Sequence, residues 1–191
     1  MREAVLRLAI VFEGGLIVLA VALGWLLGSP PFARVSLSWS AVGSGLAATL
    51  LPLAGLWRLA HSRWRPFRRL MIDVQKIVGI FVGSSYSEIA FISLLAGLGE
   101  EGFFRGVVQS ALAGLIGPTG ALLIASALFG LGHFVTPTYA LVAGVFGLYL
   151  GALLFVTGNL VPAIIVHALY DFFALIYLLR KLRLREGGGS V

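Results

Sequence analysis

The chain has 191 residues, of which 59% are hydrophobic and 12% charged, and its mean hydropathy is +1.01. A soluble domain carries about 25% charged residues, so this composition indicates an integral membrane protein and excludes an ordinary soluble domain. Cysteine is absent, which excludes disulfides and thiolate metal sites, and the net charge of +6 is concentrated beside apolar segments, which favours membrane topology over nucleic-acid binding.

Apolar segments separated by helix breakers predict an all-α, polytopic transmembrane bundle of about six spans. The first is expected to be a retained helix, because no small-residue cleavage site follows a short apolar core. The last has Asn159 as a plausible N-cap and Pro162 in its first turn. In chain order the predicted segments are residues 5–27, 37–59, 87–115, 119–134, 138–156 and 160–182.

The fourth segment is short for a span, because its length corresponds to only about 22 Å of helix. Either neighbouring helices cover it, or the backbone at residues 135–137 is broken inside the membrane. Broken backbone at that depth is tolerated where it is buried in protein or lines a wet cavity. The glycines at positions 144, 147 and 151 in the next segment predict close helix packing.

Basic residues gather in three clusters beside the apolar segments. Because lysine and arginine mark cytoplasmic loops, and six spans put both termini on one side, we expect a multi-pass protein of the cell inner (plasma) membrane with both termini cytoplasmic. Residues 61–76 fit an amphipathic helix at the lipid headgroups or a solvated basic loop equally well. The clusters are Arg2 and Arg7; Arg58, Arg63, Arg65, Arg68, Arg69 and Lys76; and Arg180, Lys181, Arg183 and Arg185.

Three ionisable residues interrupt the third apolar segment: Glu100, Glu101 and Arg105. Such side chains are costly in hydrocarbon and usually pair or face a cavity. Glu101 and Arg105 are four residues apart, so an intrahelical ion pair with a structural role is predicted. Glu100 lacks a local cation, and a desolvated carboxylate without a partner is a stronger base, so we assign it to chemistry. The alternative is a buried polar cluster that only holds helices together.

Two histidines in later segments complete the set of polar residues. His133 follows two glycines that leave room for backbone or substrate, although a membrane histidine can simply bond a carbonyl. His167 and Asp171 are four residues apart and share one helix face. In one mechanism, Glu100 and His133 activate a water while His167 and Asp171 stabilise the oxyanion. In the other, His133, His167 and Glu100 bind Zn²⁺, which activates the water.

The motifs Glu-Glu-x-x-x-Arg at 100–105, Phe-x-x-x-His at 129–133 and His-x-x-x-Asp at 167–171 occur in order on three predicted helices. This combination resembles the CPBP family, the CAAX-protease and bacteriocin-processing membrane proteins, also called Abi or type II CAAX prenyl endopeptidase-like. The resemblance extends over residues 87–173. It implies a glutamate-type intramembrane endopeptidase with a conical catalytic cavity.

By motif match, Glu100 would be the base and His133 its partner, with His167 and Asp171 on the oxyanion side. Glu101, Arg105 and Phe129 would be supporting residues. Eukaryotic CAAX-processing members carry Asn where this chain has Asp171, and an Asp side chain donates a hydrogen bond only when protonated. The CAAX-processing members also tend to have more spans.

The resemblance implies a catalytic core at residues 77–182, preceded by two helices and a basic segment at 1–76 and followed by a flexible tail at 183–191. We therefore expect an endopeptidase that cleaves a membrane-associated peptide or protein within lipid, with no nucleic-acid partner and no resident cofactor. Two alternatives are a non-proteolytic scaffold or accessory subunit of a larger membrane complex, and a zinc-dependent hydrolase using the same residues. A transporter is disfavoured because no inverted repeat is visible.

Overall fold

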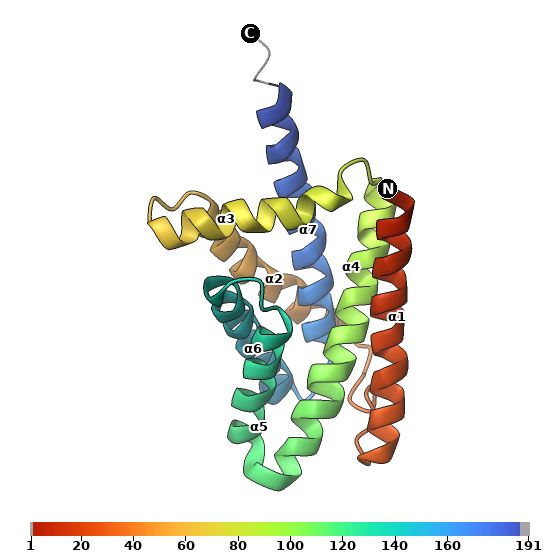
Figure 1. Ribbon diagram of the computed structural model, residues 1–191. Coiled ribbons are helices and arrows are strands. Elements are labelled where there is room, and N and C mark those ends of the chain that lie inside the picture. Colours follow the sequence, from red (N-terminus) through yellow and green to blue (C-terminus); the bar gives the residue numbers. More distant parts are fainter. Residues whose placement is uncertain (1, 188–191) are drawn as a thin grey trace.

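The computed structural model describes residues 2–187 and confirms the predicted all-α bundle, because all regular structure in this range is helical (Figure 1). The elements are α1 (Arg2–Leu26), α2 (Trp39–Ala60), α3 (Arg65–Val78), the 3₁₀ turn η1 (Gly79–Phe81), α4 (Tyr86–Glu100), the π-helix η2 (Glu101–Gln109), α5 (Ser110–Gly132), α6 (Pro137–Thr157) and α7 (Val161–Gly187).

Five helical stretches of the described chain are long and apolar enough to span a membrane, and one of them crosses twice. The stretch Tyr86–Gly132 has 47 residues, which would extend about 70 Å as one straight helix. The backbone instead reverses at Gly117, whose positive φ of 79° is a conformation that glycine adopts without steric strain. Pro118 then starts the returning arm of α5. Six crossings result, which is the predicted number.

The N-terminal end of α1, helix α3 and the C-terminal part of α7 lie at one end of the bundle (Figure 1). We call this the basic end, because the described members of all three basic clusters belong to these elements, to the adjoining end of α2 and to the loop that joins α2 to α3. The loop between α1 and α2, which contains Arg34, lies at the opposite end. This gathering of cations is the arrangement that the positive-inside rule predicts.

Helix α3 lies across the basic end, roughly perpendicular to the spans (Figure 1). Of the two alternatives for residues 61–76, the structure therefore contains the amphipathic helix. Leu70 and Met71 are buried, whereas Arg68 and Arg69 are exposed. Helix α3 continues two residues past the predicted boundary at residue 76, to Val78.

The N-terminal helices also share a core with the rest of the bundle. Leu56 of α2, Met71 of α3, Ile89 of α4 and Leu178 of α7 pack in one cluster. At the other end of the chain, α7 continues to Gly187, so residues 183–187 are helical where a flexible tail was expected. No helix breaker precedes that glycine, and leucine and arginine favour helix. The rest of the expected tail, 188–191, lies outside the described residues.

The connection between α5 and α6 lies beneath α3, short of the basic end (Figure 1). Of the two alternatives for the short fourth segment, the structure thus contains the broken backbone, at residues 133–136. Thr136 caps α6 by accepting a hydrogen bond from the amide of Tyr139 at 3.2 Å. The break places His133 inside the bundle instead of at its end.

A π-helix interrupts the predicted continuous third helix. Nine residues, Glu101–Gln109, adopt this wider turn, which is rare and occurs frequently at functional sites. Two glycines of this segment pack against the loop after α1. A Cβ at Gly102 would come within 2.9 Å of Phe32, and a Cβ at Gly106 would fall on the carbonyl oxygen of Pro31.

We expect Gly106→Ala to lower the free energy of unfolding by about 1–3 kcal/mol, because the rigid Pro31 backbone would have to move. The matched control is Gly114→Ala, where an added Cβ meets nothing within 4 Å, and which should be neutral or stabilise by up to about 1 kcal/mol. Thermal unfolding in detergent, followed by helical circular dichroism, compares the two variants. Equal stability of both would show that this contact is not tight.

Candidate active site

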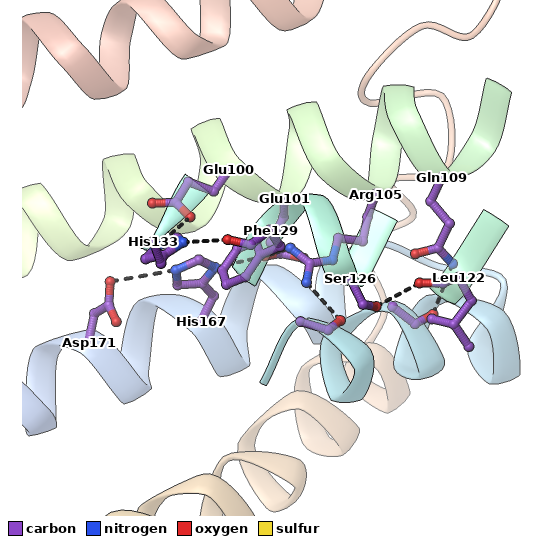
Figure 2. Close-up of polar contacts among 12 residues, drawn as sticks. Glu100, Glu101, Arg105, Gln109, Leu122, Ser126, Phe129, His133, His167 and Asp171 are labelled. Carbon is purple, nitrogen blue, oxygen red and sulfur yellow. Dashed lines mark hydrogen bonds and ion pairs between the residues drawn. The ribbon is translucent and has the colours of Figure 1, made fainter. Parts of the chain in front are cut away.

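All seven residues predicted from the three motifs converge in one region of the bundle (Figure 2). Three local features bring them together. A capping box between Ser85 and Glu88 fixes the start of α4, and the reversal at Gly117 returns α5 alongside η2. Gly130 then allows close contact with α6, because a Cβ there would lie 2.6 Å from the Ala140 carbonyl oxygen.

Glu100 and His133 face each other across the junction of α4 and the end of α5 (Figure 2). The distance from Glu100 Oε2 to His133 Nε2 is 3.5 Å. His133 Nδ1 donates to the Phe129 carbonyl at 2.9 Å, and the Phe129 ring stacks on the imidazole at 4.4 Å between centroids. Because Nδ1 carries the proton in this bond, Nε2 of the neutral ring is a free acceptor facing the carboxylate.

The buried carboxylate of Glu101 connects the supporting residue Arg105 with His167. Its Oε1 accepts from Arg105 Nη1 at 2.8 Å, which is the predicted ion pair, and from His167 Nδ1 at 2.7 Å. Arg105 also donates from Nη2 to the Gly147 carbonyl at 2.8 Å, and its guanidinium lies 4.4 Å from the centroid of the Phe129 ring. Charge-assisted hydrogen bonds from η2 therefore fix the position of His167.

His167 Nε2 lies 3.6 Å from Asp171 Oδ2 (Figure 2), which is too long for a hydrogen bond. Asp171 therefore does not orient His167 through a direct hydrogen bond. Glu101 does so instead, from a different helix. The Asp171 side chain remains about one-third exposed, so it is open to the space beside the site.

Two hollows border the site. A cavity of about 270 Å³, which we call the chamber, is lined by Glu100 and Asp171 and extends to the inner face of α3. A second cavity of about 150 Å³ is lined by His133, His167 and Asp171. Tyr139 and Tyr170 line both cavities. The two carboxylates and two histidines thus border open space inside the bundle.

Sequence reasoning did not associate Glu13, Tyr139, Tyr170 or Gln109 with the site. Glu13 of α1 lines the chamber beside Glu100, and its position as a lone acid within an apolar span was a usable signal. Gln109 donates to the Gly151 carbonyl at 3.1 Å, one turn below the equivalent bond of Arg105. The predicted close packing at Gly147 and Gly151 is therefore confirmed, and their carbonyls also accept bonds from η2.

The residues present do not fit a zinc site. Within the part of the chain that the structure describes, no three His, Asp or Glu side chains are arranged to hold a metal ion. The predicted ligand set of His133, His167 and Glu100 is thus not gathered around one point.

Comparison with known proteins agrees with the motifs. Residues 82–173 match the family described as "Type II CAAX prenyl endopeptidase Rce1-like". No curated protein and no solved structure gives a significant match to the chain. The matched segment begins just before α4 and ends in α7, so it contains all three motifs and every pair described above. Residues 82–173 of this multi-pass membrane protein are therefore similar to the CPBP family of CAAX-type intramembrane proteases.

Proposed function

We propose that the chain is an intramembrane endopeptidase in which Glu100 and His133 together activate a water molecule. The observation that carries this proposal is the 3.5 Å separation of Glu100 Oε2 and His133 Nε2. At this separation one water can contact both acceptors. Oε2 has no hydrogen-bond partner among the described residues, so it is available to take a proton.

In the proposed reaction the water oxygen attacks the peptide carbonyl carbon while Glu100 accepts one water proton. The new C–O bond gives a tetrahedral oxyanion. Glu100 then returns its proton to the amide nitrogen, the C–N bond breaks, and a carboxylic acid and an amine leave. His133 holds the water through Nε2, since its Nδ1 is occupied by the Phe129 carbonyl.

We assign the oxyanion to the side of His167 and Asp171. An imidazolium at His167, held between Glu101 at 2.7 Å and Asp171 at 3.6 Å, presents an Nε2–H donor beside the second cavity. A fixed donor at the position where negative charge develops stabilises the transition state. Asp171 adds a second donor only in its protonated form.

Asp171→Asn is expected to retain most activity, because an amide donates a hydrogen bond without needing a proton. Asp171→Ala should lower kcat/KM by about 10²-fold, which is typical of losing an oxyanion donor. Both variants are compared by cleavage of one peptide in vesicles. An inactive Asn variant beside an active Ala variant would contradict the assigned donor role.

The central experiment reconstitutes the purified chain in vesicles with single-span peptides and identifies new termini by mass spectrometry in H₂¹⁸O. We expect one ¹⁸O atom in each new carboxyl terminus and no effect of metal chelators. His133→Ala should lower the rate by about 10²-fold. His61→Ala is the matched control, because exposed His61 also bonds a carbonyl four residues earlier, that of Trp57 at 2.8 Å, outside the site.

A correctly folded protein that cleaves none of the peptides, with His133→Ala as stable as His61→Ala, would contradict the proposal and favour the non-proteolytic scaffold. Loss of activity with a chelator, restored by Zn²⁺, would favour the metal mechanism. We further propose that the basic end faces the cytoplasm of the inner (plasma) membrane, because the cations of α2, α3 and α7 gather there.

A further inference from the structure

Glu13 is an acidic residue in the middle of α1, whose span runs from Glu3 to Leu26. A carboxylate at such a position costs about 2.5–3.5 kcal/mol on insertion scales, and such residues usually mark a functional site. Its side chain lines the chamber, and its Oε2 is buried with no hydrogen-bond partner among the described residues. No hydrogen bond of the described residues therefore offsets this cost at Oε2.

Helix packing brings Glu13 beside the reactive carboxylate. A Cβ at Gly99 would lie 2.9 Å from the Glu13 carbonyl oxygen and 3.5 Å from its Oε2, so the absence of a side chain at Gly99 allows this approach. Gly99 directly precedes Glu100, which is 8% exposed and has its own unpartnered Oε2 at the same chamber. With Asp171 of α7, three carboxylates from three helices thus line one hollow.

Each of the other three carboxylates of the site contacts a guanidinium or an imidazole, whereas Glu13 has no such contact among the described residues. Glu101 pairs with Arg105, Glu100 faces His133, and Asp171 faces His167. The chamber lining contains no lysine, arginine or histidine. Its other walls are mostly apolar and come from α2, α3, α4 and α7, including Leu56, Met71, Val74, Ile92 and Leu178.

A long apolar stem with a cationic tip fits such a space, because the stem can lie against apolar walls while the tip reaches a carboxylate. We propose that Glu13 is a specificity-determining residue that selects peptides with lysine or arginine next to the scissile bond. This inference rests on the proposed endopeptidase function. An acidic residue at the same place would meet like charge and be rejected.

Three single-span peptides test the inference, identical except for Lys, Met or Glu beside the cleaved bond. We expect the wild-type protein to cleave the Lys peptide with a kcat/KM about tenfold higher than the Met peptide, with the Glu peptide slowest. In Glu13→Gln the ratio of Lys to Met should fall to about one, and in Glu13→Lys the Glu peptide should become preferred over the Lys peptide. Glu3→Gln is the matched control, because Glu3 lies on the same helix but is 77% exposed, and it should keep the wild-type ratio.

Equal cleavage of the Lys and Met peptides by the wild type, or an unchanged ratio in Glu13→Gln, would overturn the role of Glu13 while leaving the endopeptidase proposal intact. Failure to cleave any peptide would instead count against the endopeptidase. Binding of the fluorescently labelled peptides to the wild type in the same vesicles then decides the inference separately. Tighter binding of Lys than Met that is lost in Glu13→Gln supports it, and equal binding overturns it.

Discussion

Glu100→Gln is expected to abolish peptide hydrolysis, lowering kcat/KM by about 10⁴-fold, at the upper end of what a general base contributes. Glutamine has nearly the same shape, but its amide cannot take a proton from water. The glutamine amide would take the place of the carboxylate that lies 3.5 Å from His133, so the packing around this position should be preserved. Initial rates of peptide cleavage in vesicles, measured at several substrate concentrations, give the loss.

Two measurements keep this result interpretable. The thermal unfolding midpoint of Glu100→Gln should match that of the wild type, which separates lost chemistry from lost fold. Glu3→Gln, an exposed exchange of the same chemical kind, should cleave normally. Near-normal cleavage by Glu100→Gln would remove this residue from the role of base and leave the buried polar cluster as its explanation.

Arg105→Met is expected to lower the free energy of unfolding by about 3–5 kcal/mol, the typical result of removing one partner of a buried ion pair. The Arg105 side chain is 1% exposed, and its loss would leave Glu101 without its guanidinium and the Gly147 carbonyl without its donor. Methionine fills similar volume, so the loss is mainly electrostatic. Chemical unfolding of the protein in mixed micelles measures it.

The chain contains a matched surface pair of the same two residue types at the same spacing. Arg7 and Glu3 lie 3.9 Å apart with side chains 82% and 77% exposed, so Arg7→Met should change stability by less than about 1 kcal/mol. Adding Glu101→Gln to Arg105→Met should recover part of the loss, since the uncompensated carboxylate is removed. A double variant that loses the sum of both single effects would indicate that the residues act independently.

The spans could be predicted from sequence because they depend on local properties. Apolar length and the breakers at Gly28–Pro31 and Gly117-Pro118 predicted the helices and the reversal between the two arms. The Glu101–Arg105 pair was equally local, because both residues belong to one helix. The order of the motifs also indicated which side chains meet, since three in one chain are specific where one is not.

Contacts between helices could not be predicted from the same patterns. Nothing in the segment around residue 101 signals a π-helix, whose wider turn depends on packing against Pro31 and α6. The bond from His167 to Glu101 joins residues 66 positions apart. The position of α3 was undecided for a related reason. An amphipathic pattern needs a partner surface, and the core residues of α2, α4 and α7 provide it in the folded protein.

The pairing of Glu101 with Arg105 inside a single helix also matters for how the chain enters the bilayer during synthesis. The ribosome makes these residues long before α6 and α7, which later supply Gly147 and His167. Each charge therefore brings its counter-ion into the translocon, and the segment can leave it for lipid before its tertiary partners exist. Glu13 enters the bilayer earlier still, with no counter-ion close to it on α1. Its side chain is covered only after α4, whose Gly99 packs against it, has been inserted.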